Sequence, residues 1–147
     1  MRKVRIHHEE PPCDKERLRK HINLLKDIME PPLTGRVEID SYVEKLAHGA
    51  DIFYAMDGEH ICGSCAVYLN LKRGYITSFG IFSNYWRRGI GTLLLDEVSR
   101  TAKEKHIMEV ELRVYKSNEK AIRFYEKYGF EPQNIEGNWI MMRYHME

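Results

Sequence analysis

The sequence has few cysteines and no excess of charge of either sign. Its 147 residues include three cysteines, Cys13, Cys62 and Cys65, and carry a formal net charge of +1. Three cysteines cannot form the paired disulfide framework of a small secreted module. A nearly neutral chain also lacks the basic excess that is typical of a nucleic-acid binder. We therefore expect neither a disulfide-rich module nor a protein that binds nucleic acid.

Long hydrophobic runs are absent as well. No apolar segment approaches the roughly 20 residues that a membrane-spanning helix needs, and the N-terminal segment MRKVRIHHEE lacks the apolar stretch of a signal peptide. The sequence predicts no membrane partner and, by default, a cytoplasmic location. With 43% hydrophobic and 31% charged residues the composition is that of a globular protein. The length suits a single domain over residues 1–147.

A metal site is not supported by the few candidate ligands. Cys62 and Cys65 form a C-x-x-C pattern, but they lie in an alternating, strand-like run. Residues three apart on a regular strand point to opposite faces, so we expect the two sulfur atoms to diverge. Zinc needs four ligands, and the sequence has no second C-x-x-C and no H-x-x-x-H. Adjacent His7 and His8 would also face apart. We expect no metal and two passive, buried cysteines.

Hydrophobic periodicity predicts an ordered series of helices and strands. Apolar positions at helical spacing, opened by a capping residue or a glycine turn, predict helices over residues 14–29, 41–46 (with Asp40 or Ser41 as the cap), 89–105 and 118–129. Alternating runs predict strands over residues 3–8, 52–56, 60–69, 75–82, 108–114 and 138–145, with a short one near 131–135. Asp57-Gly58 predicts a hairpin turn. The order indicates a mixed α/β domain, with antiparallel hairpins first and a β-α-β-α-β half after them.

The segment NYWRRGIGTLLLDEV, residues 84–98, follows a predicted strand and opens a leucine-rich helix. Strand, glycine turn and helix in this order bring free N–H groups and the positive end of a helix dipole to one point, which favours an anion. The segment lacks the Lys-Ser/Thr pair of a P-loop and the third glycine of a dinucleotide motif, where Leu94 stands. A G-x-G turn alone equally suits a tight connection beside a solvated basic pair.

A second segment, SNEKAIRFYEKYGF, residues 117–130, follows the next predicted strand. Together the two segments resemble the GNAT superfamily of N-acetyltransferases. The first is similar to the family's pyrophosphate-binding motif. The second is similar to its N-x-x-A-x-x-x-Y-x-K-x-G-F motif, with every position in place: Asn118, Ala121, Tyr125, Lys127, Gly129 and Phe130. The resemblance is strong over residues 61–130 and weak before them. One departure is Trp86, where the family usually has Gln or Arg; we expect this indole to cover the turn.

The resemblance implies a GNAT-like fold, in which helices flank both faces of a central mixed β-sheet, and acetyl-coenzyme A as the co-substrate. Its pyrophosphate would lie on the N–H groups of the turn, namely those of Arg87, Arg88, Gly89, Ile90, Gly91 and Thr92. Its pantetheine arm would pair with the backbone of Phe79, Gly80 and Ile81, between that strand and the one from residue 108. Asn118 would contact the cofactor, and Tyr125 would face the sulfur as the general acid. The residue pattern alone suits a core aromatic at Tyr125 too.

A general base is not evident from the sequence. A primary amine with a pKa near 10 is only about one part in a thousand neutral at pH 7, so the reaction needs a base or a pocket that lowers this pKa. The strand over residues 75–82 carries no carboxylate. Some protein-acetylating relatives have a glutamate at the position of Arg113, so its absence counts against acetylation of ribosomal protein termini. Two alternatives remain for the base: Glu109 and Glu111 acting through water, or an ordered water chain. Both glutamates equally suit surface or ion-pairing roles.

The acceptor should bind to the N-terminal half, mainly residues 14–50, and to the loops after Asn70. The mixed charges of that half do not indicate a pocket for a polyanion. We expect a small-molecule amine, with an amino sugar among the candidates, in direct attack within a ternary complex. A protein N-acetyltransferase and a non-catalytic acyl-coenzyme A-binding module are the alternatives, and a homodimer is left open.

Overall fold

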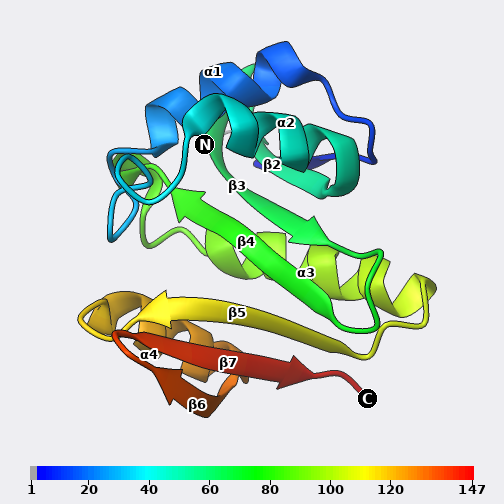
Figure 1. Ribbon diagram of the computed structural model, residues 1–147. Helices are drawn as coiled ribbons and strands as arrows, with labels where there is room; N and C mark the ends of the chain where they lie inside the picture. The colour runs from blue at the N-terminus through cyan, green and yellow to red at the C-terminus, as the bar shows by residue number, and fades with distance from the viewer. Residues whose placement is uncertain (1–2) are drawn as a thin grey trace.

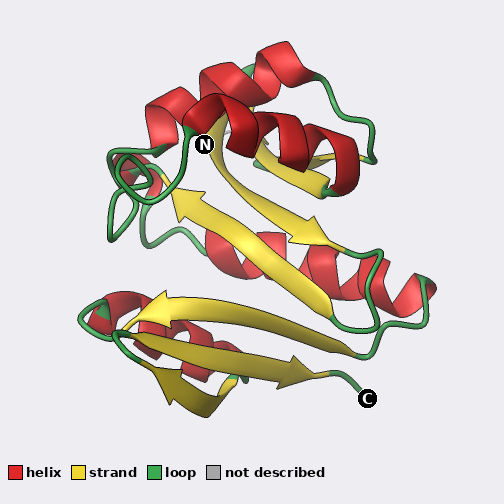
Figure 2. Cartoon of the chain, viewed as in Figure 1, coloured by secondary structure: helices red, strands yellow, loops and turns green. Residues whose placement is uncertain are grey.

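Residues 3–147, which the computed structural model describes, form one seven-stranded sheet with four α-helices and a short 3-10 helix (Figures 1 and 2). The strand order is β1-β2-β3-β4-β5-β7-β6, and neighbours run antiparallel except for β4 and β5. The elements are β1 (Arg5–Glu9), α1 (Lys15–Leu25), α2 (Ile39–Gly49), β2 (Asp51–Asp57), β3 (His60–Tyr68), β4 (Gly74–Ile81), η1 (Ser83–Tyr85), α3 (Ile90–Glu104), β5 (Glu109–Tyr115), α4 (Glu119–Tyr128), β6 (Glu131–Glu136) and β7 (Trp139–His145). The expected mixed α/β class is confirmed.

Helices cover both faces of the sheet, and each face has its own hydrophobic core. Helices α1 and α2 lie on one face, while α3 and α4 lie on the other (Figure 1). Strand β2 contributes to both cores. Ile52 and Tyr54 pack into the α1–α2 core, whereas Phe53 and Ala55 pack into the core below α3. A strand that is buried on both faces reads as a continuous apolar run rather than an alternating one, as IFYA does here.

Capping residues set the limits of the helices. Asp14 accepts a hydrogen bond from the Arg17 amide (3.1 Å) and opens α1, as the sequence predicts, but the helix ends at Leu25 instead of Met29. The predicted start of α2 is wrong. Glu38 caps it by accepting from the Ser41 amide (2.6 Å), and the helix runs to Gly49. Glutamate is not among the favoured capping residues, so the pattern pointed to Asp40 or Ser41 instead.

Cys62 and Cys65 do not diverge to opposite faces of the sheet, so that prediction is wrong. The β2–β3 register shifts where Ala55 faces Gly63 and Met56 faces Ile61, so Cys62 is the extra residue of a β-bulge. The bulge breaks the alternation, and Cys62 and Cys65 both lie fully buried in the core below α3. Burial raises the pKa of both thiols, so both stay protonated.

Neither a cluster of metal ligands nor a membrane-spanning helix occurs among the described residues. Within residues 3–147, no three His, Cys, Asp or Glu side chains gather as metal ligands would. His7 contacts Glu9 (3.0 Å) and His8 contacts Asp51 (2.7 Å), so the neighbouring imidazoles face different partners. The helices in this part of the chain are all too short or too polar to span a bilayer.

Strands β4 and β5 pair only briefly before they separate. Their parallel register covers Gly74 with Val110, Tyr75 with Glu111, and Ile76 with Leu112. Beyond Ile76, β4 keeps its antiparallel partner β3 as far as Ile81, while β5 continues to pair with β7. Figure 1 shows the two strands diverging toward the start of α4. In the described chain, the β4 edge over residues 77–81 therefore faces β5 without a strand partner.

Candidate active site

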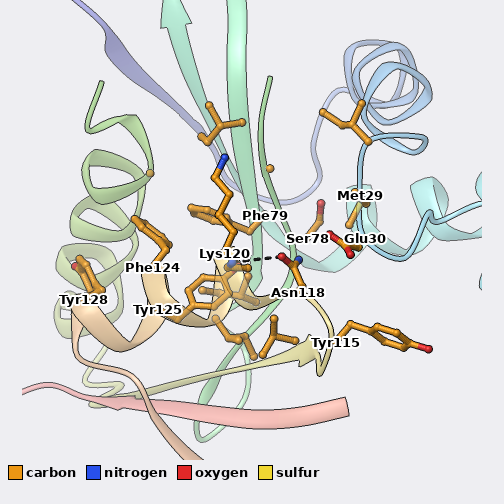
Figure 3. Close-up of a pocket in the computed structure, with 18 of the residues that line it drawn as sticks. Met29, Glu30, Ser78, Phe79, Tyr115, Asn118, Lys120, Phe124, Tyr125 and Tyr128 are labelled. Carbon is orange, nitrogen blue, oxygen red and sulfur yellow. Dashed lines mark hydrogen bonds between the residues drawn. The ribbon is translucent and has the colours of Figure 1, made fainter. Parts of the chain in front are cut away.

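A cavity of about 820 Å³ lies where β4 and β5 separate. Its walls come from β4, the turn before α3, the end of β5, helix α4 and the loop between α1 and α2. Figure 3 shows aromatic side chains of α4 on one wall and Met29 and Glu30 from the α1–α2 loop on another. The volume is in the range of small-molecule sites. Segments far apart in the sequence thus meet around one space.

The glycine turn forms one end of the cavity. Arg87 and Gly89 have left-handed backbones (φ 63° and 75°), and no atom lies within 4 Å of a Cβ built on Gly89. Gly89 caps α3 without a side-chain hydrogen bond, so the first amides of that helix keep their donors for a ligand. The turn lines the cavity with five of its predicted residues: Arg87, Gly89, Ile90, Gly91 and Thr92. This end is suited to an anion.

Arg88 differs from the rest of the turn. Its guanidinium lies 5.3 Å from the centre of the Tyr85 ring, and the residue is not part of the cavity lining. The structure therefore separates the two arginines that the sequence placed together: Arg87 borders the cavity, whereas the Arg88 guanidinium lies over the Tyr85 ring.

Gly91 is needed for packing. A Cβ at this position would approach the Phe124 ring to 2.8 Å and the Phe79 ring to 3.4 Å. Phe79 and Phe124 are stacked on each other, with centroids 5.8 Å apart, and both line the cavity. The absence of a side chain at Gly91 lets α4 approach the start of α3, which brings the two motif segments together.

Tyr125 lies at the base of this aromatic cluster. It is 7% exposed, borders the cavity and contacts Phe79, Phe124 and Phe130 ring to edge. Burial, and to a smaller extent Cys65, raises its pKa above the ordinary value for tyrosine. Its hydroxyl has no hydrogen-bond partner among the described residues. Tyr125 is thus a core aromatic and a cavity residue at once, with a proton that it keeps at neutral pH.

Asn118 and Trp86 flank the same space. The Asn118 side-chain oxygen accepts from the Ala121 amide (3.3 Å), which caps α4, and the residue lines the cavity (Figure 3). Trp86 donates from Nε1 to the Ile81 carbonyl (2.8 Å), and Lys120 Nζ lies 3.1 Å from the centre of its ring. The indole therefore covers the turn, and with Lys120 it connects the two motif segments.

The predicted carboxylates lie elsewhere. Glu109 contacts Arg73 (2.9 Å) and Glu111 contacts Arg143 (2.6 Å), and neither borders the cavity. Of the alternatives open for these two residues, the ion-pairing one agrees with these contacts. Among the described residues, the one carboxylate that lines the cavity belongs to Glu30, in the α1–α2 loop (Figure 3). No motif marked it, because its position depends on how an irregular loop folds over the sheet.

Comparisons with known proteins agree with this geometry. A model of the acetyltransferase (GNAT) family matches residues 17–130. N-alpha-acetyltransferase 50 of Danio rerio is 34% identical over 115 residues, a match that covers 78% of this chain and 61% of that protein, so the chain corresponds to about three fifths of this relative's length.

Solved structures share the fold. The PaiA N-acetyltransferase from Thermoplasma acidophilum, in complex with coenzyme A, superimposes with a TM-score of 0.78 at 20% identity, covering 97% of this chain and 99% of the other. The ribosomal-protein-S18-alanine N-acetyltransferase from Escherichia coli gives a TM-score of 0.76 at 16% identity, covering 99% and 95%. Because the family model spans most of the chain, and the separated strands, glycine turn and asparagine-capped helix occur together, the chain belongs to the GNAT family of acetyltransferases.

Proposed function

We propose that this protein is an N-acetyltransferase that transfers the acetyl group of acetyl-coenzyme A directly to a small primary amine within a ternary complex. The observation that carries the proposal is a single cavity with two unlike walls. One wall consists of backbone groups suited to a phosphate chain, and the other holds Glu30, the only carboxylate of the described lining. The carboxylate attracts the ammonium end of an amine, while the cationic side chains of the same lining disfavour its charged form and so lower the pKa of the bound amine.

The cofactor wall fits acetyl-coenzyme A. The amides of Ile90, Gly91 and Thr92 and the side chain of Arg87 would hold the pyrophosphate, since the turn leaves open space at Gly89. The β4 edge over residues 79–81 offers backbone groups for the pantetheine amides. When bound, the co-substrate supplies an activated acetyl thioester. The protein's contribution is to place it and to exclude water.

Proton transfers would be divided between two side chains. The bound ammonium would first give one proton to the Glu30 carboxylate, which passes it to solvent. The neutral nitrogen would then form its bond to the acetyl carbon and lose a second proton to the same carboxylate, the only one of the described lining. The bond from that carbon to sulfur breaks, and the departing thiolate needs a proton. Tyr125, whose raised pKa keeps its hydroxyl protonated, is positioned to donate it. Both steps are proposed roles for residues of this chain.

A small acceptor is favoured by how the α1–α2 loop closes the cavity. The Arg36 guanidinium lies 5.2 Å from the Trp139 ring centre, so the loop reaches across to β7. A contact there narrows the space through which an extended peptide would enter. A protein N-terminus is the second candidate, because the relative from Danio rerio is named as an N-alpha-acetyltransferase.

Thiol release on incubation with acetyl-coenzyme A tests both candidates. The panel should contain alkylamines, amino sugars, amino acids and short peptides with free N-termini. We expect turnover with small amines and a loss of about 10²-fold or more in kcat/KM for Glu30→Gln, the usual contribution of a positioned acid or base. Glu126→Gln, an exposed α4 change outside the cavity lining, is the matched control.

The outcomes separate the alternatives. Turnover confined to the peptides would overturn the small-molecule acceptor. Tight coenzyme A binding without thiol release from any amine would point instead to a binding module. Equal rates for Glu30→Gln and the parent enzyme would remove Glu30 from the mechanism while leaving the acceptor class intact.

A further inference from the structure

Two arginines of the acceptor wall have no acidic partner. The arginines that form ion pairs in the described chain all lie outside the cavity lining; examples are Arg73, Arg100 and Arg143, each within 3 Å of a glutamate oxygen. Arg36 and Arg113 both line the cavity, and neither makes an ion pair with any residue in the described chain. Two uncompensated guanidinium groups at one site favour the binding of an anion.

Both guanidiniums are held on the same aromatic ring. Their central carbon atoms lie 5.2 Å from the Trp139 ring centre, a distance at which cations bind the face of an indole. Tyr115, which is paired with Trp139 across β5 and β7, contacts the indole ring to edge (5.1 Å). The aromatic support restricts both side chains to one region, although they come from the α1–α2 loop and from β5.

Arg36 is oriented by the backbone. Its Nε donates to the Pro32 carbonyl (3.2 Å) and its Nη2 to the Pro31 carbonyl (3.0 Å). The third nitrogen, Nη1, makes no hydrogen bond to any residue of the described chain. Partial burial lowers the pKa of Arg36 somewhat, yet guanidinium groups remain charged in proteins. A fixed, charged donor that is not used internally is preorganised for a ligand.

Arg113 marks the place where the strands part. It follows Leu112, the last β5 residue that pairs with β4. The glycine turn lies at the opposite end of the β4 segment that faces the cavity, after Ile81. A co-substrate anchored at the turn and extended along β4 would direct its acetyl group toward this vertex. Arg113 and Arg36 are therefore on the acceptor side, away from the phosphate end.

We propose that Arg36 and Arg113, held on Trp139, form an anion-recognition site, so that the acceptor is an amine that also carries a carboxylate or a phosphate-type group. Glu30 would bind its ammonium end and the two guanidiniums its anionic end. The inference rests on the proposed function, because it assumes a small amine as the acceptor. It selects amino acid-like acceptors over amino sugars and polyamines.

Matched acceptor pairs test the selectivity. Amino carboxylates with two to six carbons between the charged ends are compared with alkylamines of equal length, and aminoalkyl phosphonates distinguish the two kinds of anion. We expect the best acid to exceed its alkylamine by about 10- to 100-fold in kcat/KM, as hydrogen bonds between charged groups allow. Arg36→Gln and Arg113→Gln should each reduce this ratio, whereas Arg123→Gln, an exposed α4 change outside the cavity, should preserve it.

A binding measurement separates this inference from the proposed function. Trp86 and Trp139 are the two tryptophans of the chain, so Trp86→Phe leaves Trp139 as the only indole reporter. N-acetylated amino carboxylates, which cannot react, should change its fluorescence saturably, and their amides should not. Loss of that response in Arg113→Gln supports the site even if no amine turns over, in which case the proposed function alone fails. Equal responses to acids and amides, or no response to either, would overturn the inference.

Discussion

The two walls of the cavity use different chemistry. The cofactor wall, from Gly89 to Thr92 and along β4, presents backbone amides and carbonyls. The acceptor wall presents the side chains of Glu30, Arg36 and Arg113. Backbone donors do not depend on residue type, so apart from Arg87 the first wall constrains mainly its glycine positions. On the second wall each side chain contributes its own charge, and specificity can change with one substitution without loss of the cofactor site.

The largest effect is expected for a change at Tyr125, a side chain of α4 that borders the cavity. Tyr125→Phe keeps the ring and its aromatic contacts, so turnover should fall about 10²–10⁴-fold if the hydroxyl is the general acid, with little change in the KM for acetyl-coenzyme A. Stability should change little, because the hydroxyl makes no hydrogen bond within the described chain. Rapid-mixing kinetics and thermal melting measure the two effects.

The pH profile sharpens that test. Since burial raises the pKa of Tyr125, its proton stays in place up to and beyond the ordinary tyrosine value near 10. Turnover should therefore show no alkaline loss from this group below about pH 10. A Phe variant with near-full turnover would mean that the residue only packs and that water protonates the thiolate.

Gly91 tests the backbone wall. Gly91→Asp places a side chain against Phe124 and a carboxylate beside the turn, so repulsion of the pyrophosphate should raise the dissociation constant of acetyl-coenzyme A by about 10²-fold, roughly 3 kcal/mol. Gly91→Ala has the same Cβ without the charge and is the control. Calorimetry should show a smaller loss for Ala. Unchanged binding in a folded Asp variant would contradict the phosphate assignment.

His21 tests how firmly α1 supports the acceptor wall. It is buried beside Ser64, with Nε2 2.6 Å from Oγ, and burial lowers its pKa to about 4 from an ordinary 6.5. Between these two pKa values the unfolded chain binds more protons than the folded one. The free energy of unfolding therefore keeps the full contribution of neutral His21 above pH 6.5 and loses it as the pH falls toward 4. The loss should approach about 3 kcal/mol.

Denaturant unfolding at a series of pH values measures that loss. His21→Gln retains a hydrogen-bonding side chain but does not titrate. Its free energy of unfolding should therefore change less with pH between 4 and 6.5 than that of the parent. His48→Gln, an exposed change on α2, should keep the parent slope. Identical slopes in all three proteins would show that His21 does not control the acid limit.

The smallest expected effect on turnover concerns the buried cysteines. Cys62→Ala with Cys65→Ala should leave turnover within a few-fold, because both thiols lie below α3 and neither lines the cavity. The unfolding free energy should fall by about 1–3 kcal/mol, as for other small losses of core volume. Elemental analysis should find no zinc in the parent. Stoichiometric zinc that disappears with the two cysteines would refute their passive role.

The two walls also differ in how well the sequence predicts them, because one uses local backbone features and the other uses side chains brought together by the fold. The turn, Asn118 and Gly129 are local features, since caps and left-handed glycines depend on neighbours in the chain. Glu30 and Trp139 enter the site only through tertiary contacts. The sequence pattern did not predict the Cys62 bulge or the Glu38 cap. The bulge interrupts the regular alternation of a strand, and glutamate is an unusual capping residue. The proposed cofactor turn is thus largely encoded by local sequence, whereas the proposed acceptor site depends on the assembled fold.

The short pairing of β4 with β5 leaves an edge of β4 exposed within the sheet. An unpaired strand edge is a template on which another extended chain can add. With acetyl-coenzyme A bound as proposed, the pantetheine arm serves as a temporary strand that shields residues 79–81. Each product release would return those amides to solvent exchange, and co-substrate supply would set how long the edge stays exposed. The metabolite would then act as a folding partner of the sheet as well as a source of acetyl groups.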